Sequence, residues 1–509
     1  MYITACKHES NNYPCGANRR DIFLNGVLFM DTPNQTKKQP KNIFGTTSKS
    51  NFILNMKQET LQNWIAALLA ACVIVPQITG FLVYGVNASP AFMSAGLYFT
   101  GFSCILFFLI AMIKGCLSFK KDKILWLIVF MAVWAFASYY CVVLRPNVAS
   151  EVVNTALAGE IGRYEGLLSL LGYFGIFCLA ACVTRTKTVR IIMDSIVAVG
   201  VVQSLFAVFQ HIPKLRFMPN FADLPTVALK DVMLSHGLSE NPIVFGTFLT
   251  IVFAAALTGA VYEKNILRAR IYGAASMLFW LVGFFTSSIV PIIGMSAVFV
   301  IVSILIFASK PIAFENGILK SSVYRYAAAA VGMAVIFALI WIFQGIYIRD
   351  KAIAYYDAFF RLYIVTNYSV ANDQSLYGIG LEKSLYFIKE HTLFGIGPDL
   401  MAKYQMANDT LSLCSIDRSY NEIVYVAATR GIPAAAAFAV FLAASLKSSF
   451  GKFKASIKGG EWQDTALFVA VTAYIIQSFF SFSSVLCAPI FWILCGFAFR
   501  KITDKGANS

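Results

Sequence analysis

Long apolar stretches separated by short polar connections dominate the pattern of this sequence. Most approach or exceed the roughly 18 to 20 residues that a helix needs to cross a hydrocarbon core of about 30 Å. Lipid offers no hydrogen-bond partner to the backbone, so each stretch must be helical. The pattern predicts an all-α polytopic membrane protein with about 12 transmembrane helices. They are expected near residues 64–85, 92–113, 124–144, 166–184, 191–211, 242–262, 271–287, 290–309, 326–346, 423–446, 465–485 and 486–499.

The polar segments divide the chain into four predicted parts. These are a disordered cytoplasmic tail (1–60), transmembrane helices 1 to 9 (61–346), a large extracytoplasmic loop (347–422), and helices 10 to 12 with a short cytoplasmic tail (423–509). An alternative for the first part is that translation starts at Met56, directly before the first apolar stretch.

The loop 347–422 is the longest predicted connection. Loops of this length are usually functional or disordered. This one mixes aromatic and charged residues, and Leu381, Leu385, Ile388 and Leu393 fall near helical spacing. We therefore expect a helical extracytoplasmic subdomain between helices 9 and 10, lying at the membrane surface.

Basic residues gather in alternate connections, as in KKDK (120–123), RTKTVR (185–190) and KSSFGKFK (447–454). Cytoplasmic loops carry such an excess of Lys and Arg, which places both termini in the cytoplasm. The formal net charge of +15 is therefore largely a topology signal. Because the charge is scattered over many loops instead of forming one basic module, the sequence argues against nucleic-acid binding.

The eleven cysteines lie mostly in or beside apolar stretches, with Cys414 in the large loop as the exception. A single outer cysteine cannot build an intramolecular disulfide framework. No CxxC pair or Cys/His cluster indicates zinc. We expect neither a metal nor a soluble cofactor.

The apolar stretches contain almost no charge, and Arg430 is the main exception. A charge at the bilayer centre costs about 2.5–3.5 kcal/mol on insertion scales. Two interpretations stay open: Arg430 extends toward the interface, or it faces a polar cleft under the large loop. Pro433 is expected to break or kink the helix there. Ion-coupled transporters usually place carboxylates at mid-membrane, so the polar chemistry here favours reaction or binding at the outer face.

Four ordered stretches resemble the O-antigen ligase and polymerase family of multi-spanning glycosyltransferases. They are GRYEGLLSLLGY (162–173), SENPIVFGTFL (239–249), GIGLEKSLYFIKEHTLFGIGPDLM (378–401) and DRSYNEIVYVAATRGIP (417–433). The resemblance covers roughly residues 60–500. It implies an undecaprenyl-diphosphate-linked glycan as donor, two outer-face Arg residues that hold the diphosphate, and a His as general base. This chain instead has Ile289, Tyr377 and Tyr420 at the three matching positions.

Arginine suits a diphosphate because its planar fork makes two charge-assisted hydrogen bonds to phosphate. The candidate diphosphate-binding residues are Arg163, Arg361 and Arg418, and the candidate catalytic residues are Asp417, Tyr420 and Glu422, with Glu165 as a further possible base. Supporting roles fall to Asn421, Gly395, Gly397 and Tyr377. Each has a structural alternative: the arginines anchor helix ends or are solvated, Asn421 caps a helix, Tyr420 is an interfacial aromatic, and the glycines form a turn.

The resulting hypothesis is an O-antigen ligase-like enzyme of the bacterial cytoplasmic (inner) membrane. It would move or polymerise an undecaprenyl-diphosphate-linked glycan at the outer face, onto a glycan, lipid or protein acceptor. The three replaced positions keep a second hypothesis open, in which a non-catalytic member binds lipid-linked glycan or a biosynthetic partner. A glycan flippase or other transporter is the third, because twelve spans suit that class. The sequence does not separate ligase from polymerase.

Overall fold

Helices make up most of the described chain, in which no strand is found. The computed structural model describes residues 57–85, 88–117, 121–161, 163–211, 235–239, 242–286, 288–308, 321–342, 376–404, 418–459 and 462–501. The helices are α2 (Gln58–Gly80) with its π-helical continuation η1 (Phe81–Gly85), α3 (Ala91–Ile113), α4 (Ile124–Val143), α5 (Ser150–Ala158), α6 (Leu167–Ala181), α7 (Thr186–His211), α8 (Pro242–Tyr262), α9 (Ile266–Phe285), α10 (Ile289–Ala308), α12 (Leu376–Glu390), α13 (Glu422–Arg430), α14 (Ile432–Gly459), α15 (Trp462–Ser478) and α16 (Ala488–Phe499).

Nine helices in the described part are long and apolar enough to cross a membrane, among them Ser322–Ile342. The prediction of an all-helical, multi-pass membrane protein is therefore confirmed, whereas the number twelve stays a prediction. Two further apolar helices, α6 and α16, have only 15 and 12 residues. The predicted span 423–446 is divided between α13 and α14.

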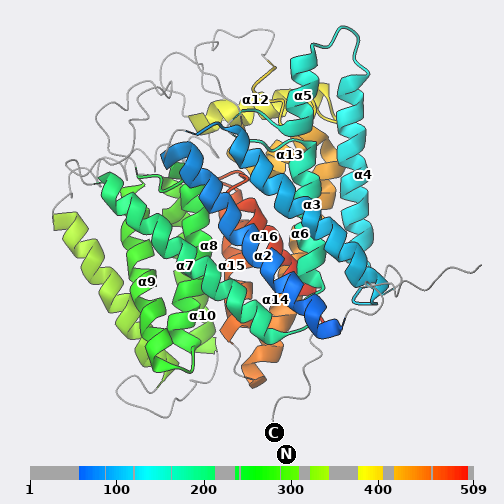
Figure 1. Ribbon diagram of the computed structural model, residues 1–509. Helices are drawn as coiled ribbons and strands as arrows, with labels where there is room; N and C mark the ends of the chain where they lie inside the picture. Colours follow the sequence, from blue (N-terminus) through cyan, green and yellow to red (C-terminus); the bar gives the residue numbers. More distant parts are fainter. Residues whose placement is uncertain are drawn as a thin grey trace, which may run out of the picture. The chain divides into compact units, whose positions relative to one another are not determined.

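The helices run alternately up and down (Figure 1), so that α2 begins and α16 ends at the same end of the bundle. We call this the basal end; it holds the ion pair between Lys501 and Asp122, with 2.7 Å between Nζ and Oδ1. The opposite end, the site end, carries α5, α12 and α13, at the top in Figure 1.

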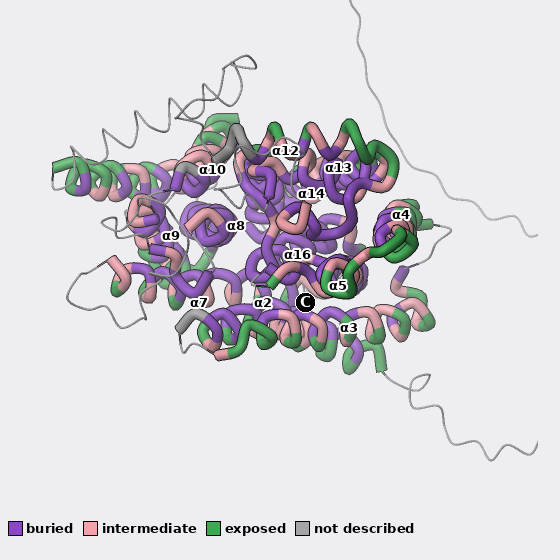
Figure 2. The backbone as a smooth tube through the Cα atoms, turned by 90° about the horizontal axis from the view of Figure 1, so that it is seen from above, coloured by how far each residue is buried: buried purple, intermediate pink, exposed green. Residues whose placement is uncertain are grey.

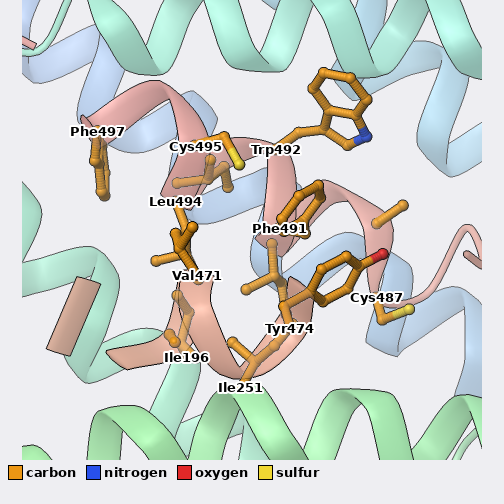
Figure 3. Packing of buried hydrophobic residues seen from close by; sticks show 14 of the residues in the cluster. Ile196, Ile251, Val471, Tyr474, Cys487, Phe491, Trp492, Leu494, Cys495 and Phe497 are labelled. Carbon is orange, nitrogen blue, oxygen red and sulfur yellow. The ribbon is translucent and has the colours of Figure 1, made fainter. Parts of the chain in front are cut away.

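The most buried helices lie at the centre of the bundle, as Figure 2 shows for α8 and α16, while α3 and α4 expose apolar residues outward. Trp126 of α4 is 60% exposed, as expected of a side chain that meets lipid. Aromatic stacking joins the central helices: the rings of Tyr474 on α15 and Phe491 on α16 lie 3.8 Å apart and nearly parallel (Figure 3).

A second, smaller apolar cluster forms at the site end. It packs α12 and the segment after it onto α4, α5 and α13, and it comprises Val142, Ala156, Phe387, Ile396, Leu400, Met401, Tyr425 and Ala428. Three of the four positions noted for helical spacing in the large loop lie on α12, and Phe387 of this helix is buried in the cluster. Residues 347–375 and 405–417 of the predicted loop, and residues 1–56 of the predicted tail, lie outside the described residues.

Candidate functional site

A helix break at the site end positions Arg430. Asn421 starts α13 by accepting a hydrogen bond at its Oδ1 from the backbone N–H of Val424 (3.1 Å), as helix-capping residues do. Gly431 then ends the helix with a φ of 86°. This left-handed conformation suits glycine, since other residues meet a steric penalty there. Pro433, expected to cause the break, lies instead in the first turn of α14, where proline fits well.

The segment after α12 covers the end of α13 and satisfies its backbone. The N–H groups of Ile396 and Gly397 donate to the carbonyl oxygens of Ala428 (3.0 Å) and Thr429 (2.9 Å). From α4, the indole N–H of Trp134 donates to the carbonyl oxygen of Arg430 at 3.1 Å. The last carbonyls of a helix otherwise lack partners, so these contacts fix the direction in which α13 ends.

Gly395 and Gly397 allow this close approach. Their φ angles are 67° and 118°. A Cβ atom on Gly395 would lie 2.3 Å from the carbonyl carbon of Thr429, which no side chain tolerates. The structure thus supports the turn interpretation of both glycines. Asn421 likewise acts as a helix cap.

Asp399, in the same segment, is the partner of Arg163. Their side chains form an ion pair of 2.9 Å and are 1% and 6% exposed. The carboxylate of Asp399 also accepts hydrogen bonds from the hydroxyl of Tyr425 (2.8 Å) and from the N–H groups of Glu160 (2.7 Å) and Glu165 (3.2 Å). The ion pair of Arg163 with Asp399 thereby connects the segment before α6 to the segment after α12.

A cavity lined by both polar and apolar side chains includes Asp399 of this ion pair in its wall. Its empty volume is about 460 Å³ when the space at its open mouth is included, but only about 30 Å³ is open to the centres of water-sized molecules. In this conformation it admits water or a small charged group, so a larger ligand would extend through the mouth. It is lined by Glu165, Leu170, Tyr173, Pro398, Asp399, Glu422, Tyr425, Thr429, Arg430, Phe438, Ser483 and Trp492.

Two carboxyl groups in the cavity hold protons unusually well. Burial raises the pKa of Glu165 to about 8, with a further contribution from the negative charge of Asp399. Burial also raises the pKa of Glu422 to about 7. Tyrosine hydroxyls hold both groups: Tyr173 donates to Glu165 (3.2 Å) and Tyr474 to Glu422 (3.0 Å). Near neutral pH Glu165 is therefore mostly protonated, whereas Glu422 is close to half-titration.

Arg430 is the cation of the cavity. Among the described residues its guanidinium makes no ion pair and no hydrogen bond, although Glu165 and Glu422 lie near enough to act on it electrostatically. The buried charges at the basal end differ in this respect. There Arg500 pairs with Asp464, and Glu263 pairs with Arg190. Of the two interpretations of Arg430, the structure supports the one in which it faces a polar cleft.

Arg418 and Tyr420 lie beside the cavity, on the ring of Phe482. The Cζ atom of Arg418 is 3.9 Å from the centre of that ring. The ring of Tyr420 is tilted against it at 5.7 Å. Neither residue lines the cavity itself.

The structure thus brings several predicted residues together at one end of the bundle: Arg163, Gly395, Gly397, Arg418, Tyr420, Asn421 and Glu422, together with Glu165. Of the proposed catalytic and diphosphate-binding residues that the structure describes, Glu422 and the further candidate base Glu165 line the cavity. Arg361 and Asp417 lie outside the described residues. Tyr377 is on α12, but its side chain is not described.

Sequence reasoning did not find the roles of Asp399, Tyr173, Tyr425, Ser483 and Trp492. Asp399, Tyr173 and Tyr425 stand within stretches that resemble the family, which is the local signal that could have found them, whereas Ser483 and Trp492 lie outside those stretches. Among the described residues no group of three His, Cys, Asp or Glu side chains could hold a metal ion. The polar side chains that line the cavity carry a guanidinium, carboxyls and hydroxyls.

A comparison of the sequence with protein-family models matches no family, and a comparison with curated proteins matches none of them. The geometry of the cavity and the stretches that resemble the ligase family are therefore the observations that bear on function.

Proposed function

We propose that this protein is a membrane glycosyltransferase of the O-antigen ligase and polymerase type, acting on an undecaprenyl-diphosphate-linked glycan at the outer face of the bacterial cytoplasmic membrane. One observation carries the proposal. Arg430, without an ion-pair partner among the described residues, faces a cavity that also contains Glu165 and Glu422.

The stretches that resemble the family support this proposal by where they meet. The first (162–173) contributes Glu165 to the cavity, the third (378–401) contributes Asp399, and the fourth (417–433) contributes Arg430. The second (239–249) lies next to it. Thr247 shares a hydrogen bond of 2.7 Å with Ser481, two residues before Ser483 of the cavity wall. Segments so far apart in sequence are expected to converge if they serve one reaction.

In the proposed reaction Arg430 binds the donor diphosphate. Its guanidinium offers two parallel N–H donors to phosphate oxygens and keeps its charge throughout. The acceptor hydroxyl oxygen attacks the anomeric carbon of the donor sugar. The bond from that carbon to the diphosphate oxygen breaks, and the diphosphate leaves with the bonding electrons, stabilised by Arg430.

Glu422 is the proposed general base that takes the proton of the acceptor hydroxyl. Its pKa of about 7 is well matched to proton transfer at neutral pH. Glu165, with a pKa of about 8, is mostly protonated there and can donate a hydrogen bond. Tyr420 is less suited as a base, because an ordinary phenol has a pKa near 10. In this scheme the buried carboxylate of Glu422 acts as the general base, a role that the resemblance assigns to a His.

The test uses the full chain in lipid nanodiscs with an undecaprenyl-diphosphate-linked glycan. Release of undecaprenyl diphosphate is measured for wild type, Arg430→Gln and Glu422→Gln. Loss of the cation should slow release by roughly 10²–10³-fold, and loss of the base by roughly 10²–10⁴-fold. Arg185→Gln, which removes a partly exposed arginine at the basal end, is the matched control and should leave release unchanged.

A second candidate function is binding of a lipid-linked glycan without transfer. It is favoured by the ion pair of Arg163 with Asp399, because a guanidinium paired with a carboxylate is less suited to binding the donor diphosphate. Donor binding that depends on Arg430, with no release by the wild type, would support this candidate over the enzyme. Absence of both donor binding and release would refute both.

A further inference from the structure

The connection between α15 and α16 places three consecutive side chains in three different environments. Ser481 shares a hydrogen bond with Thr247 on α8. Ser483 lines the cavity. Phe482, between them, is 3% exposed and lies under Arg418. The positions of Ser481 and Ser483 therefore restrict the backbone on both sides of Phe482.

The Cζ atom of Arg418 lies over this ring, 3.9 Å from the ring centre. The face of an aromatic ring is electron-rich and attracts a cation, more strongly when both are shielded from water. Arg418 is 7% exposed, so the shielding is considerable. A guanidinium also carries several N–H donors in its plane, which match the geometry of phosphate oxygens.

Arg418 also acts on the cavity electrostatically. Its positive charge opposes the increase that burial and Asp399 produce in the pKa of Glu165. Tyr420 packs against the same ring, at 5.7 Å, and thus confines Phe482 from another direction. The guanidinium of Arg418 is therefore held near a cavity that it does not line.

We propose that Phe482 is a positioning residue that holds Arg418 at the rim of the cavity, so that Arg418 and Arg430 together bind a diphosphate. The ligand part of this inference rests on the proposed function. The contact itself does not, because the cation and the ring are in place without a ligand.

The test replaces Phe482 with mono-, di- and trifluorophenylalanine in the full chain in nanodiscs. Fluorine withdraws electron density from the ring and nearly preserves its shape. The affinity for inorganic diphosphate is then measured. It should fall stepwise with the number of fluorines, by about three- to tenfold at trifluorophenylalanine, which is the range expected for a cation–π contact. A ring that acts only by packing would give equal affinities along the series.

Two controls make the result specific. The same fluorinated series at Phe491, a buried ring stacked on Tyr474 and not on a cation, should leave affinity unchanged. In the Arg418→Gln background, fluorination of Phe482 should have no further effect on affinity. An equal loss with and without Arg418 would overturn the inference.

A measurement without ligand separates this inference from the proposed function. The melting temperature is determined for wild type, Phe482→Leu, Arg418→Gln and the double variant. If the double variant loses less melting temperature than the sum of the losses in the two single variants, the predicted contact is present. A loss equal to that sum overturns the inference. If the contact is present but the wild type binds no diphosphate, the proposed function fails, and so does the binding role of Phe482.

Discussion

Three arginines near the cavity differ in what surrounds their guanidinium groups. Arg163 is buried with Asp399, Arg418 is stacked on Phe482, and Arg430 faces the cavity. Breaking a buried ion pair by removing one partner typically costs about 3–5 kcal/mol of stability. Arg163 is thus suited to holding the fold, while Arg430, with no such partner among the described residues, is suited to holding an anion.

The two cavity carboxyls predict how stability depends on pH. Their pKa values of about 8 (Glu165) and about 7 (Glu422) exceed the ordinary value of 4.5. Between pH 4.5 and 8 the folded protein therefore binds more protons than the unfolded chain, so its stability falls as pH rises through this window. Thermal unfolding in nanodiscs from pH 5 to 9 should show this decline, and Glu165→Gln should make it shallower.

The control for this experiment is Glu59→Gln, at the basal end, where the Glu59 side chain is 70% exposed. Its pH dependence should match that of the wild type. A decline of equal steepness in Glu165→Gln would show that Glu165 does not keep its proton in the folded state.

The sequence predicted which residue types gather here but not how they pair. Arg163 and Asp399 are 236 positions apart, and nothing local to either residue indicates the other. The importance of Arg430 could be anticipated because a charge within an apolar stretch is costly. The positions of Ser483 and Phe482 could not, because they follow from how the connection between α15 and α16 packs against α8 and the start of α13.

Among the elements, the break between α13 and α14 matters most for the cavity. An apolar stretch of suitable length predicted one continuous helix, with Pro433 as the point of disturbance. The break occurs at Gly431 instead, because the segment after α12 approaches the backbone there. The carbonyl oxygen of Leu393 would lie 1.9 Å from a Cβ atom on Gly431. That approach is tertiary and leaves no periodicity in the sequence.

Gly431→Ala should accordingly destabilise the protein. With φ of 86° and ψ of 166°, Gly431 adopts a conformation nearly restricted to glycine, which costs another residue on the order of 1–3 kcal/mol, and the clash with Leu393 adds to that. Gly451→Ala in α14 is the matched control, since a Cβ atom there meets nothing within 4 Å. Alanine within a helix is favoured over glycine by roughly 0.5–1 kcal/mol. Melting temperatures should therefore move in opposite directions, and a neutral Gly431→Ala would argue against the close approach.

For the whole molecule, hydrophobicity predicted the class of fold more reliably than the number of spans. Long apolar stretches produced long helices such as α3 and α4, whose outer faces are exposed. α16 has 12 residues and is almost wholly buried by other helices. A helix that contacts protein on all sides need not match the bilayer thickness, so apolar length alone could not decide how it crosses.

The distribution of charge predicts which way the molecule faces. The basic segments 185–190 and 447–454, predicted as connections, belong to the start of α7 and the last part of α14; they lie at the basal end, and the cavity lies at the other. Cytoplasmic loops carry the excess of Lys and Arg, so we expect the basal end inside the cell and the cavity outside.

In a cysteine-free chain, Glu390→Cys and Lys454→Cys place single thiols at exposed positions of the two ends. A membrane-impermeant maleimide should label the first in intact spheroplasts, and the second only after permeabilisation. Failure to label cytosolic thiols in the same cells verifies that the membrane is closed. The reverse pattern would place Arg430 and its two carboxyls on the cytoplasmic side, and the proposed transfer at the outer face would have to be abandoned even if the cavity binds diphosphate.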